Sequence, residues 1–259
     1  MNIVVCVKHV PDATADRRFD PADSTVDRAG VDGLLSELDE YAVEEALKLT
    51  DDGEGEVTAL TVGPERAGDA IRKALQMGAH KGVHVVDDGI HGSDSVATSL
   101  VLAAALEKLE FDLVLCGMAS TDGVMGVVPA MLAERLGVPQ VTYAAQLSVE
   151  ANQVTVRRDS DTAAETVVAS TPAVVSVTDQ INEPRYPSFK GIMAAKKKPF
   201  ETWSLSDLGV DPSQVGLNAS WTAVISYDAR PPRSAGTVVV DAGDGGVKLA
   251  EFLATQKFV

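Results

Sequence analysis

The chain has 259 residues, of which 45% are hydrophobic and only 5% are aromatic. This length suits one large domain, alone or with an appended subdomain, and the prevalence of Ala, Val and Leu favours helices packed on buried parallel strands over an all-β sandwich. A net charge of −16 argues against binding to nucleic acid or to an anionic membrane surface.

The two cysteines, Cys6 and Cys116, lie in or at the end of apolar runs, which indicates buried thiols in a reducing compartment. Neither CxxC nor HExxH occurs, so we expect no metal site. The first residues lack the basic region and cleavage site of a signal peptide, and no apolar run approaches the roughly 20 residues that span a bilayer. We therefore expect a cytoplasmic protein without membrane insertion.

The first half of the chain alternates strands and helices. Uninterrupted apolar runs predict strands at residues 3–7, 57–62, 83–86 and 112–116, with a polar loop between residues 11 and 33. Helices are predicted after a capping box at Ser36-Glu37-Leu38-Asp39, over 66–77, from a Ser93 cap to Leu109, and over 127–136. This alternation predicts an α/β fold with a doubly wound, mostly parallel sheet. Sheets of this kind bind their ligands beyond the carboxyl ends of the strands, so we expect the site in the loops that follow Val7, Val62 and Cys116.

After residue 138 the pattern changes to short β segments. We predict strands at 141–149, 154–157, 166–169 and 174–178, which extend or flank the sheet as hairpins. From Gln180 onward the chain is irregular, apart from a last helix near 247–254. Because the residues from Glu183 lack the pattern of a self-sufficient core, we predict that they form an extended C-terminal tail wrapped around another subunit.

The first candidate site lies between the fourth strand and the fourth helix, over Gly117-Met118-Ala119-Ser120-Thr121-Asp122-Gly123-Val124-Met125-Gly126-Val127-Val128. Small residues let the backbone turn tightly and present N–H groups beside a helix N-terminus, which favours phosphate. Asp122 could bind a ribose hydroxyl or cap the helix. The alternative is an ordinary loop with glycines for turn geometry, since neither GxGxxG nor GxxxxGK[ST] occurs.

Lys8 and His9 close the first strand. Lys8 could pair with a phosphate, whereas we expect His9 to be a solvated residue at the strand end. The sequence contains no GxSxG motif, no convincing Cys–His pair and no well-placed carboxylate dyad. We therefore expect no acid–base or covalent catalysis, and no catalytic turnover by this chain itself.

A patterned segment at Asn182-Glu183-Pro184-Arg185-Tyr186-Pro187-Ser188-Phe189-Lys190-Gly191-Ile192-Met193-Ala194-Ala195-Lys196-Lys197-Lys198 combines prolines, aromatic residues and a lysine run. Loops of this length are usually functional or disordered, and disordered segments avoid Tyr, Phe, Ile and Met, so we expect this one to dock on a partner. The basic residues could face an acidic patch of that partner, or could simply be solvated.

Over nearly its whole length the sequence resembles the beta subunit of electron-transfer flavoprotein. The resemblance rests on residues 5–8, 39–46, 74–79, 182–186, 192–198 and 231–236. It implies a Rossmann-like, adenine-nucleotide-binding fold and an electron carrier that forms a heterodimer with an alpha subunit, which holds most of the FAD. It also implies electron donors of the acyl-CoA dehydrogenase type and a quinone oxidoreductase as acceptor.

The resemblance also implies site residues. A structural AMP would contact Cys6, Ser36, Glu37, Leu38, Asp39, Val62, Gly117, Met118, Ala119, Ser120, Thr121, Asp122, Gly123, Val124, Met125, Gly126, Val127 and Val128. Partner contacts would come from Asp159, Arg185, Tyr186, Phe189, Ile192, Met193 and Lys197, with Phe189 as the apolar anchor and Asp159 facing an alpha-subunit arginine near the flavin. Residues 1–182 would form the nucleotide-binding domain, and residues 183–259 the recognition loop and an arm on the alpha subunit.

The chain departs from that family pattern in the phosphate loop. Relatives often carry Asp-Thr-Gly-Gln where Val124-Met125-Gly126-Val127 stands, and Asn-Pro where Ser36-Glu37 stands. Backbone N–H groups would then hold the phosphate with fewer side-chain hydrogen bonds. Two alternatives remain open: an electron-bifurcating flavoprotein subunit with a second FAD in place of AMP, and a stand-alone adenine-nucleotide sensor on a similar fold.

Overall fold

The computed structural model describes residues 1–51, 53, 55–228, 231–232 and 236–258. They form two compact units, Met1–Ala223 and Val224–Val259. The second unit contains the helix α7 (Gly245–Thr255), close to the range that the sequence predicts. Arg233, Ser234 and Ala235, which belong to the range 231–236 on which part of the resemblance rests, lie outside the described residues.

A seven-stranded parallel sheet forms the centre of the first unit. Across the sheet the strands are β12 (Phe200–Trp203), β5 (Lys81–Val85), β4 (Glu56–Val62), β1 (Asn2–Cys6), β6 (Leu113–Gly117), β11 (Ala173–Val177) and β7 (Gln140–Ala144). The chain runs outward from β1 through β4 to β5 and then returns to β6, on the other side of β1. The strand order therefore reverses between β1 and β6, which confirms the doubly wound α/β fold and makes these two strand ends its switch point.

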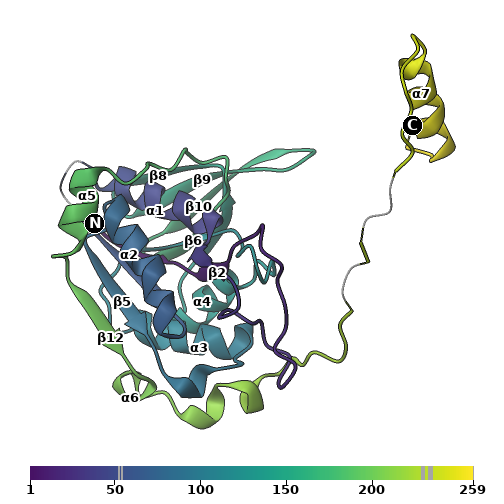
Figure 1. Cartoon of the computed structure of the whole chain (residues 1–259). Coiled ribbons are helices and arrows are strands. Elements are labelled where there is room, and N and C mark those ends of the chain that lie inside the picture. The colour runs from purple at the N-terminus through teal and green to yellow at the C-terminus, as the bar shows by residue number, and fades with distance from the viewer. Residues whose placement is uncertain (52, 54, 229–230, 233–235, 259) are drawn as a thin grey trace. The chain divides into compact units, whose positions relative to one another are not determined.

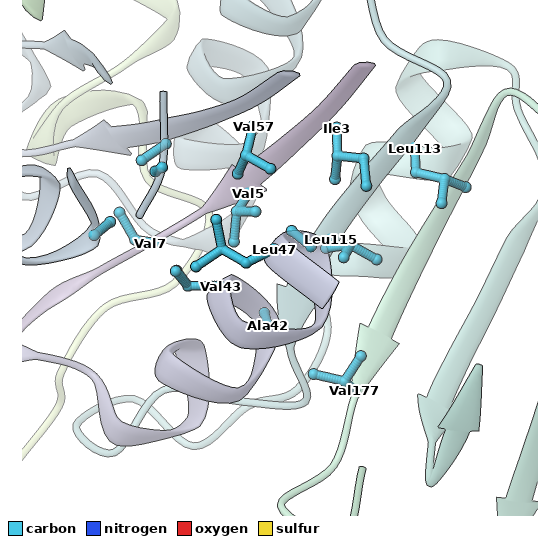
Figure 2. Packing of buried hydrophobic residues seen from close by; sticks show 14 of the residues in the cluster. Ile3, Val5, Val7, Ala42, Val43, Leu47, Val57, Leu113, Leu115 and Val177 are labelled. Carbon is cyan, nitrogen blue, oxygen red and sulfur yellow. The ribbon is translucent and has the colours of Figure 1, made fainter. Parts of the chain in front are cut away.

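Helices cover both faces of this sheet (Figure 1). They are α1 (Glu37–Leu49) and α2 (Gly68–Met77) on one face, and α3 (Ser95–Leu106) and α4 (Val128–Leu136) on the other. Strand β1 is buried on both sides, because Val5 packs in a cluster with Val43 of α1 whereas Val4 packs with Leu132 of α4. Figure 2 shows the first of these clusters, around Val5, Val43 and Leu47. Burial on both faces explains the uninterrupted apolar run that predicted this strand.

The β segments after residue 138 are arranged differently from the prediction. The expected strand at 141–149 is two strands, β7 of the main sheet and β8 (Gln146–Glu150), which forms a separate antiparallel sheet with β9 (Gln153–Asp159) and β10 (Ala164–Ser170). Tyr143, with a φ of +61°, distorts the end of β7, and only Ala145 separates β7 from β8. The expected hairpin strand near 174–178 is β11, which lies parallel between β6 and β7. The hairpins therefore flank the main sheet, and β11 belongs to its interior.

Two predicted helix caps are wrong. Ser36 precedes α1, but its hydroxyl caps no N–H group, and Asp39 is engaged elsewhere. Helix α3 is capped by Asp94, whose carboxylate accepts a hydrogen bond from the Ala97 N–H at 3.0 Å. The Ser93 hydroxyl instead accepts a hydrogen bond from the Gly216 N–H, and the helix ends at Leu106 rather than Leu109. Between β1 and α1, the short antiparallel strands β2 (His9–Pro11) and β3 (Gly33–Leu35) bracket the predicted polar loop.

The first compact unit extends past the predicted boundary at 182/183 to Ala223. It includes α5 (Phe189–Ala195), β12, α6 (Leu205–Leu208) and the short 3-10 helices η1 (Glu65–Ala67), η2 (Asp88–Ile90), η3 (Pro212–Gln214) and η4 (Leu217–Ala219). Strand β12 pairs with β5, and the Lys198 ammonium donates to the carbonyls of Leu75, Gly78 and Ala79 at the end of α2. Residues 183–223 therefore belong to the first compact unit, whereas the prediction assigned them to the arm on the alpha subunit. No helix in the described residues is long and apolar enough to cross a membrane.

Candidate functional site

The candidate site lies at the carboxyl edge of the central strands. Cys6 of β1 stands opposite Cys116 of β6, and Val62 ends the neighbouring strand β4. Lys8 follows β1 and the loop over residues 118–127 follows β6, so the two loops begin at the switch point. The structure thus brings together the strand-end residues that the sequence placed at one edge.

Asp39, near the start of α1, joins the two strand ends. Its buried carboxylate accepts hydrogen bonds from the backbone N–H groups of Lys8, at 2.8 Å, and Gly117, at 3.3 Å. Burial raises the pKa of Asp39 to about 7, although these two hydrogen bonds and the charge of Lys8 act in the opposite direction. A Cβ on Gly117 would lie 2.8 Å from the Leu38 carbonyl, so only glycine permits this close approach. The N-terminus of α1 is therefore fixed against the switch point.

Ser36 adds an unpaired polar atom to this region. Its hydroxyl is fully buried and forms no hydrogen bond with any described residue. Buried polar groups are nearly always satisfied, so an orphaned hydroxyl calls for a missing partner such as a ligand.

The loop after β6 has the geometry of an anion site. Gly126 has a φ of +65° and Val124 a φ of +56°, which for a β-branched residue is a strained, left-handed conformation. The backbone N–H groups of Met125, Gly126 and Val127 form no hydrogen bond within the described residues, and Val127 caps α4 without using a side chain. Free N–H groups at a helix N-terminus are a favourable environment for phosphate.

Asp122 is the centre of a charge cluster at this loop. Its side chain is 4% exposed and pairs with the Lys8 ammonium at 2.7 Å and the Arg28 guanidinium at 2.9 Å. Burial would raise the pKa of Asp122, but Lys8, Ser120 and Arg28 outweigh it and lower the pKa to about 2. The carboxylate also accepts from the Gly123 N–H at 2.7 Å. Asp122 therefore does not cap α4, and Lys8 reaches it rather than standing free.

Sequence reasoning missed the arginines of the loop between β2 and β3. Arg28 pairs with Asp122, and Arg17 donates to the Thr121 carbonyl at 2.8 Å. Nothing in their local sequence points to the site, because the loop reaches it only through the fold.

His9 differs from its prediction as a solvated residue. The ring is buried against Gly33, and its Nε2 has no hydrogen-bond partner among the described residues. Burial lowers the pKa of His9, so the ring is neutral near pH 7. We therefore assign it a packing role.

The predicted partner contacts fall into two groups. Tyr186 and Phe189 are 93% and 80% exposed, and Ile192, Met193 and Lys197 are exposed beside them. The second group, Arg185 and Asp159, forms ion pairs within the chain. Arg185 pairs with Glu44 at 2.7 Å and with Asp51 at 3.2 Å, and Asp159 pairs with Arg157 at 2.9 Å.

No three His, Cys, Asp or Glu side chains of the described residues are placed to share a metal ion. The free backbone N–H groups of the loop after β6 and the cations around Asp122 are donors that suit an anionic group such as a phosphate.

Comparison with known proteins places the chain in a family. The electron transfer flavoprotein domain model matches residues 23–208. The chain is 49% identical to the electron transfer flavoprotein subunit beta of Mycobacterium leprae and 48% identical to that of Mycobacterium tuberculosis, in each case over 100% of this chain and 99% of the relative. It is 36% identical to the Caffeyl-CoA reductase-Etf complex subunit CarD of Acetobacterium woodii, over 92% of both chains. The chain therefore belongs to the family of electron transfer flavoprotein beta subunits.

Proposed function

We propose that this chain is the beta half of a heterodimeric electron carrier, whose alpha subunit holds most of an FAD. The observation that carries the proposal is the full-length similarity to two proteins named as beta subunits. The second compact unit supports a partner, because Val247, Leu249 and Phe252 of α7 are exposed apolar side chains. Covering such residues is a usual function of a subunit interface.

We propose AMP as the ligand of the switch-point site. Its phosphate would lie against the free N–H groups of Met125, Gly126 and Val127, and the Ser36 hydroxyl offers a further polar contact. The bound nucleotide would have a structural role, joining the loop after β6 to the N-terminus of α1. We propose that the chain has no catalytic turnover of its own and that the flavin supplies the redox chemistry when it is bound.

We propose that α5 and the residues before it form the docking surface for electron donors of the acyl-CoA dehydrogenase type, with Phe189 as anchor. A ring that is 80% exposed at the start of a helix is free to enter a partner's pocket. The reduced carrier would pass its electrons to a quinone oxidoreductase. Asp159, at the end of β9, would face the alpha subunit near the flavin.

A second candidate is an electron-bifurcating subunit with FAD in the beta nucleotide site. The similarity to a subunit of a Caffeyl-CoA reductase-Etf complex leaves it open, because that relative's name places it within a larger reductase complex. The exposed apolar side chains of Val124 and Met125 favour it, because they line the loop where polar residues would otherwise contact AMP. A stand-alone nucleotide sensor is disfavoured, because such a protein would have no use for the exposed apolar residues of α5 and α7.

Nucleotide extraction from the co-purified alpha–beta complex tests the proposal. We expect one FAD and one AMP per complex, measured by absorbance and chromatography after denaturation. Two FAD molecules and no AMP would establish the bifurcating alternative. A complex without any adenine nucleotide beyond the alpha subunit's FAD would contradict an occupied switch-point site.

A further inference from the structure

The loop between β2 and β3, which we name the cover segment (residues 12–32), reaches the candidate site from a distant part of the sequence. Two arginines attach it to the loop after β6. Arg17 donates to the Thr121 carbonyl at 2.8 Å, and Arg28 pairs with Asp122 at 2.9 Å. A third contact, between Asp23 and His91 at 2.7 Å, holds the segment at a different place. The cover segment is therefore fixed beside the proposed phosphate position.

The charge of this cluster is unusual for the chain. Lys8, Arg17 and Arg28 contribute three positive charges and Asp122 one negative charge, a net excess of two cations in a chain whose net charge is −16. Arg17 has no carboxylate within ion-pair distance among the described residues. The nearby Asp12 carboxylate instead accepts hydrogen bonds from Thr14. Arg17 thus has no ion-pair partner among the described residues and bonds to the same loop whose N–H groups at Met125, Gly126 and Val127 are free, a combination that suits a dianion such as a phosphate monoester.

The two arginines differ in what they can do. Arg28 and Lys8 grip the two oxygens of a carboxylate that is 4% exposed, so their charges are largely committed to Asp122. Arg17 is exposed and uses only one N–H group, toward a neutral carbonyl. The remaining donors of its planar fork are free for a bidentate contact.

We propose that the cover segment completes the nucleotide site, with Arg17 binding the phosphate directly and Arg28 acting as a positioning residue that holds the Asp122 carboxylate away from it. This inference rests on the proposed function, because it requires a phosphate at the loop after β6. It adds the recognition of the phosphate by side chains that lie about a hundred residues before that loop in the sequence.

Equilibrium binding of AMP and of adenosine to the full-length chain, in complex with its alpha subunit, tests this inference. For Arg17→Ala we expect AMP affinity to fall by roughly tenfold or more, while adenosine affinity stays unchanged. Arg17→Lys should recover part of the loss, since it restores the charge without the fork. Arg18→Ala is the matched control, because Arg18 lies next in sequence, is highly exposed and pairs only with Asp16 at 3.0 Å.

The positioning role of Arg28 has its own test. Arg28→Ala should weaken the binding of AMP more than the binding of adenosine. One oxygen of the Asp122 carboxylate then loses its cation, and its negative charge repels the phosphate. Adding Asp122→Asn to the Arg28→Ala variant should restore AMP affinity, because it removes the repelling charge. A purely structural role of Arg28 would not predict this recovery.

The outcomes separate this inference from the proposed function. If the wild-type complex binds neither AMP nor FAD at this site, the proposed function fails. If the wild-type complex binds AMP, and the Arg17→Ala complex binds AMP and adenosine with the wild-type affinities, the assignment of Arg17 is overturned. If the double variant binds AMP no better than Arg28→Ala does, the assignment of Arg28 is overturned.

Discussion

Asp39 makes the stability of this fold depend on pH in a way that one substitution should remove. The pKa of its buried carboxyl is about 7 in the folded chain, against an ordinary value of 3.8. Near pH 5 the folded chain therefore binds a proton that the unfolded chain does not. That proton stabilises the fold at low pH, and the stabilisation is lost as the pH rises through 7.

The size of this effect follows from the two pKa values. Between about pH 5 and pH 8 the folded carboxyl releases its proton, whereas the unfolded carboxyl is already ionised, so the free energy of unfolding falls by roughly 2 to 3 kcal/mol. The side chain of the Asp39→Asn variant cannot titrate, so the variant does not show this fall in the free energy of unfolding. Its amide has one carbonyl oxygen, which can accept from the Lys8 N–H but not also from the Gly117 N–H. The lost hydrogen bond lowers the stability of the variant by the same amount at every pH.

Urea unfolding of wild type and Asp39→Asn at several pH values measures the difference. The wild type should lose roughly 2 to 3 kcal/mol more than the variant between about pH 5 and pH 8. Asp69→Asn, which removes an exposed carboxylate paired with Arg72, is a control that should follow the wild type. If Asp39→Asn and wild type lose stability in parallel, the carboxyl is not protonated in the fold and the reasoning is refuted.

Three further substitutions test other parts of the structure. Val124→Gly should raise the free energy of unfolding by about 1 kcal/mol in urea titrations, because it relieves a left-handed φ at an exposed side chain; a lower value would contradict the strain. Arg185→Ala should lower that free energy by about 3 kcal/mol by leaving buried Glu44 unpaired, whereas Asp51→Asn, at the exposed end of the same network, should cost under about 1 kcal/mol. Phe189→Ala should leave stability unchanged yet weaken docking to a partner dehydrogenase by roughly tenfold or more in steady-state reduction assays; unchanged apparent affinity would remove Phe189 from the docking surface.

Uninterrupted apolar runs predicted the central strands well. β1, β4 and β6 are buried on both faces, so their residues carry a signal that does not depend on distant parts of the chain. β12 was missed, because its residues Phe200–Trp203 are largely exposed at the sheet edge and show no such run. β11 was detected but given the wrong neighbours, since pairing is decided by where the chain inserts a strand and not by the strand's own residues.

The candidate site was predictable only where its chemistry is local. The glycines of the loop after β6 indicated a phosphate loop, and the strand ends indicated its place in the sheet. Asp39 fits the pattern of a helix cap, yet its carboxylate accepts hydrogen bonds from the N–H groups of Lys8, which follows β1, and Gly117, which ends β6. Arg17 and Arg28 reach the site across the fold from a loop with no motif. Such contacts between residues far apart in sequence leave no trace in local patterns.

The most direct test of the central claim is size-exclusion chromatography of the tagged full-length chain, expressed together with its candidate alpha subunit and followed by flavin absorbance. We expect the two chains to elute as one complex that carries flavin. Elution of the chain alone, colourless and without a flavin-bearing partner, would contradict its assignment as half of an electron carrier.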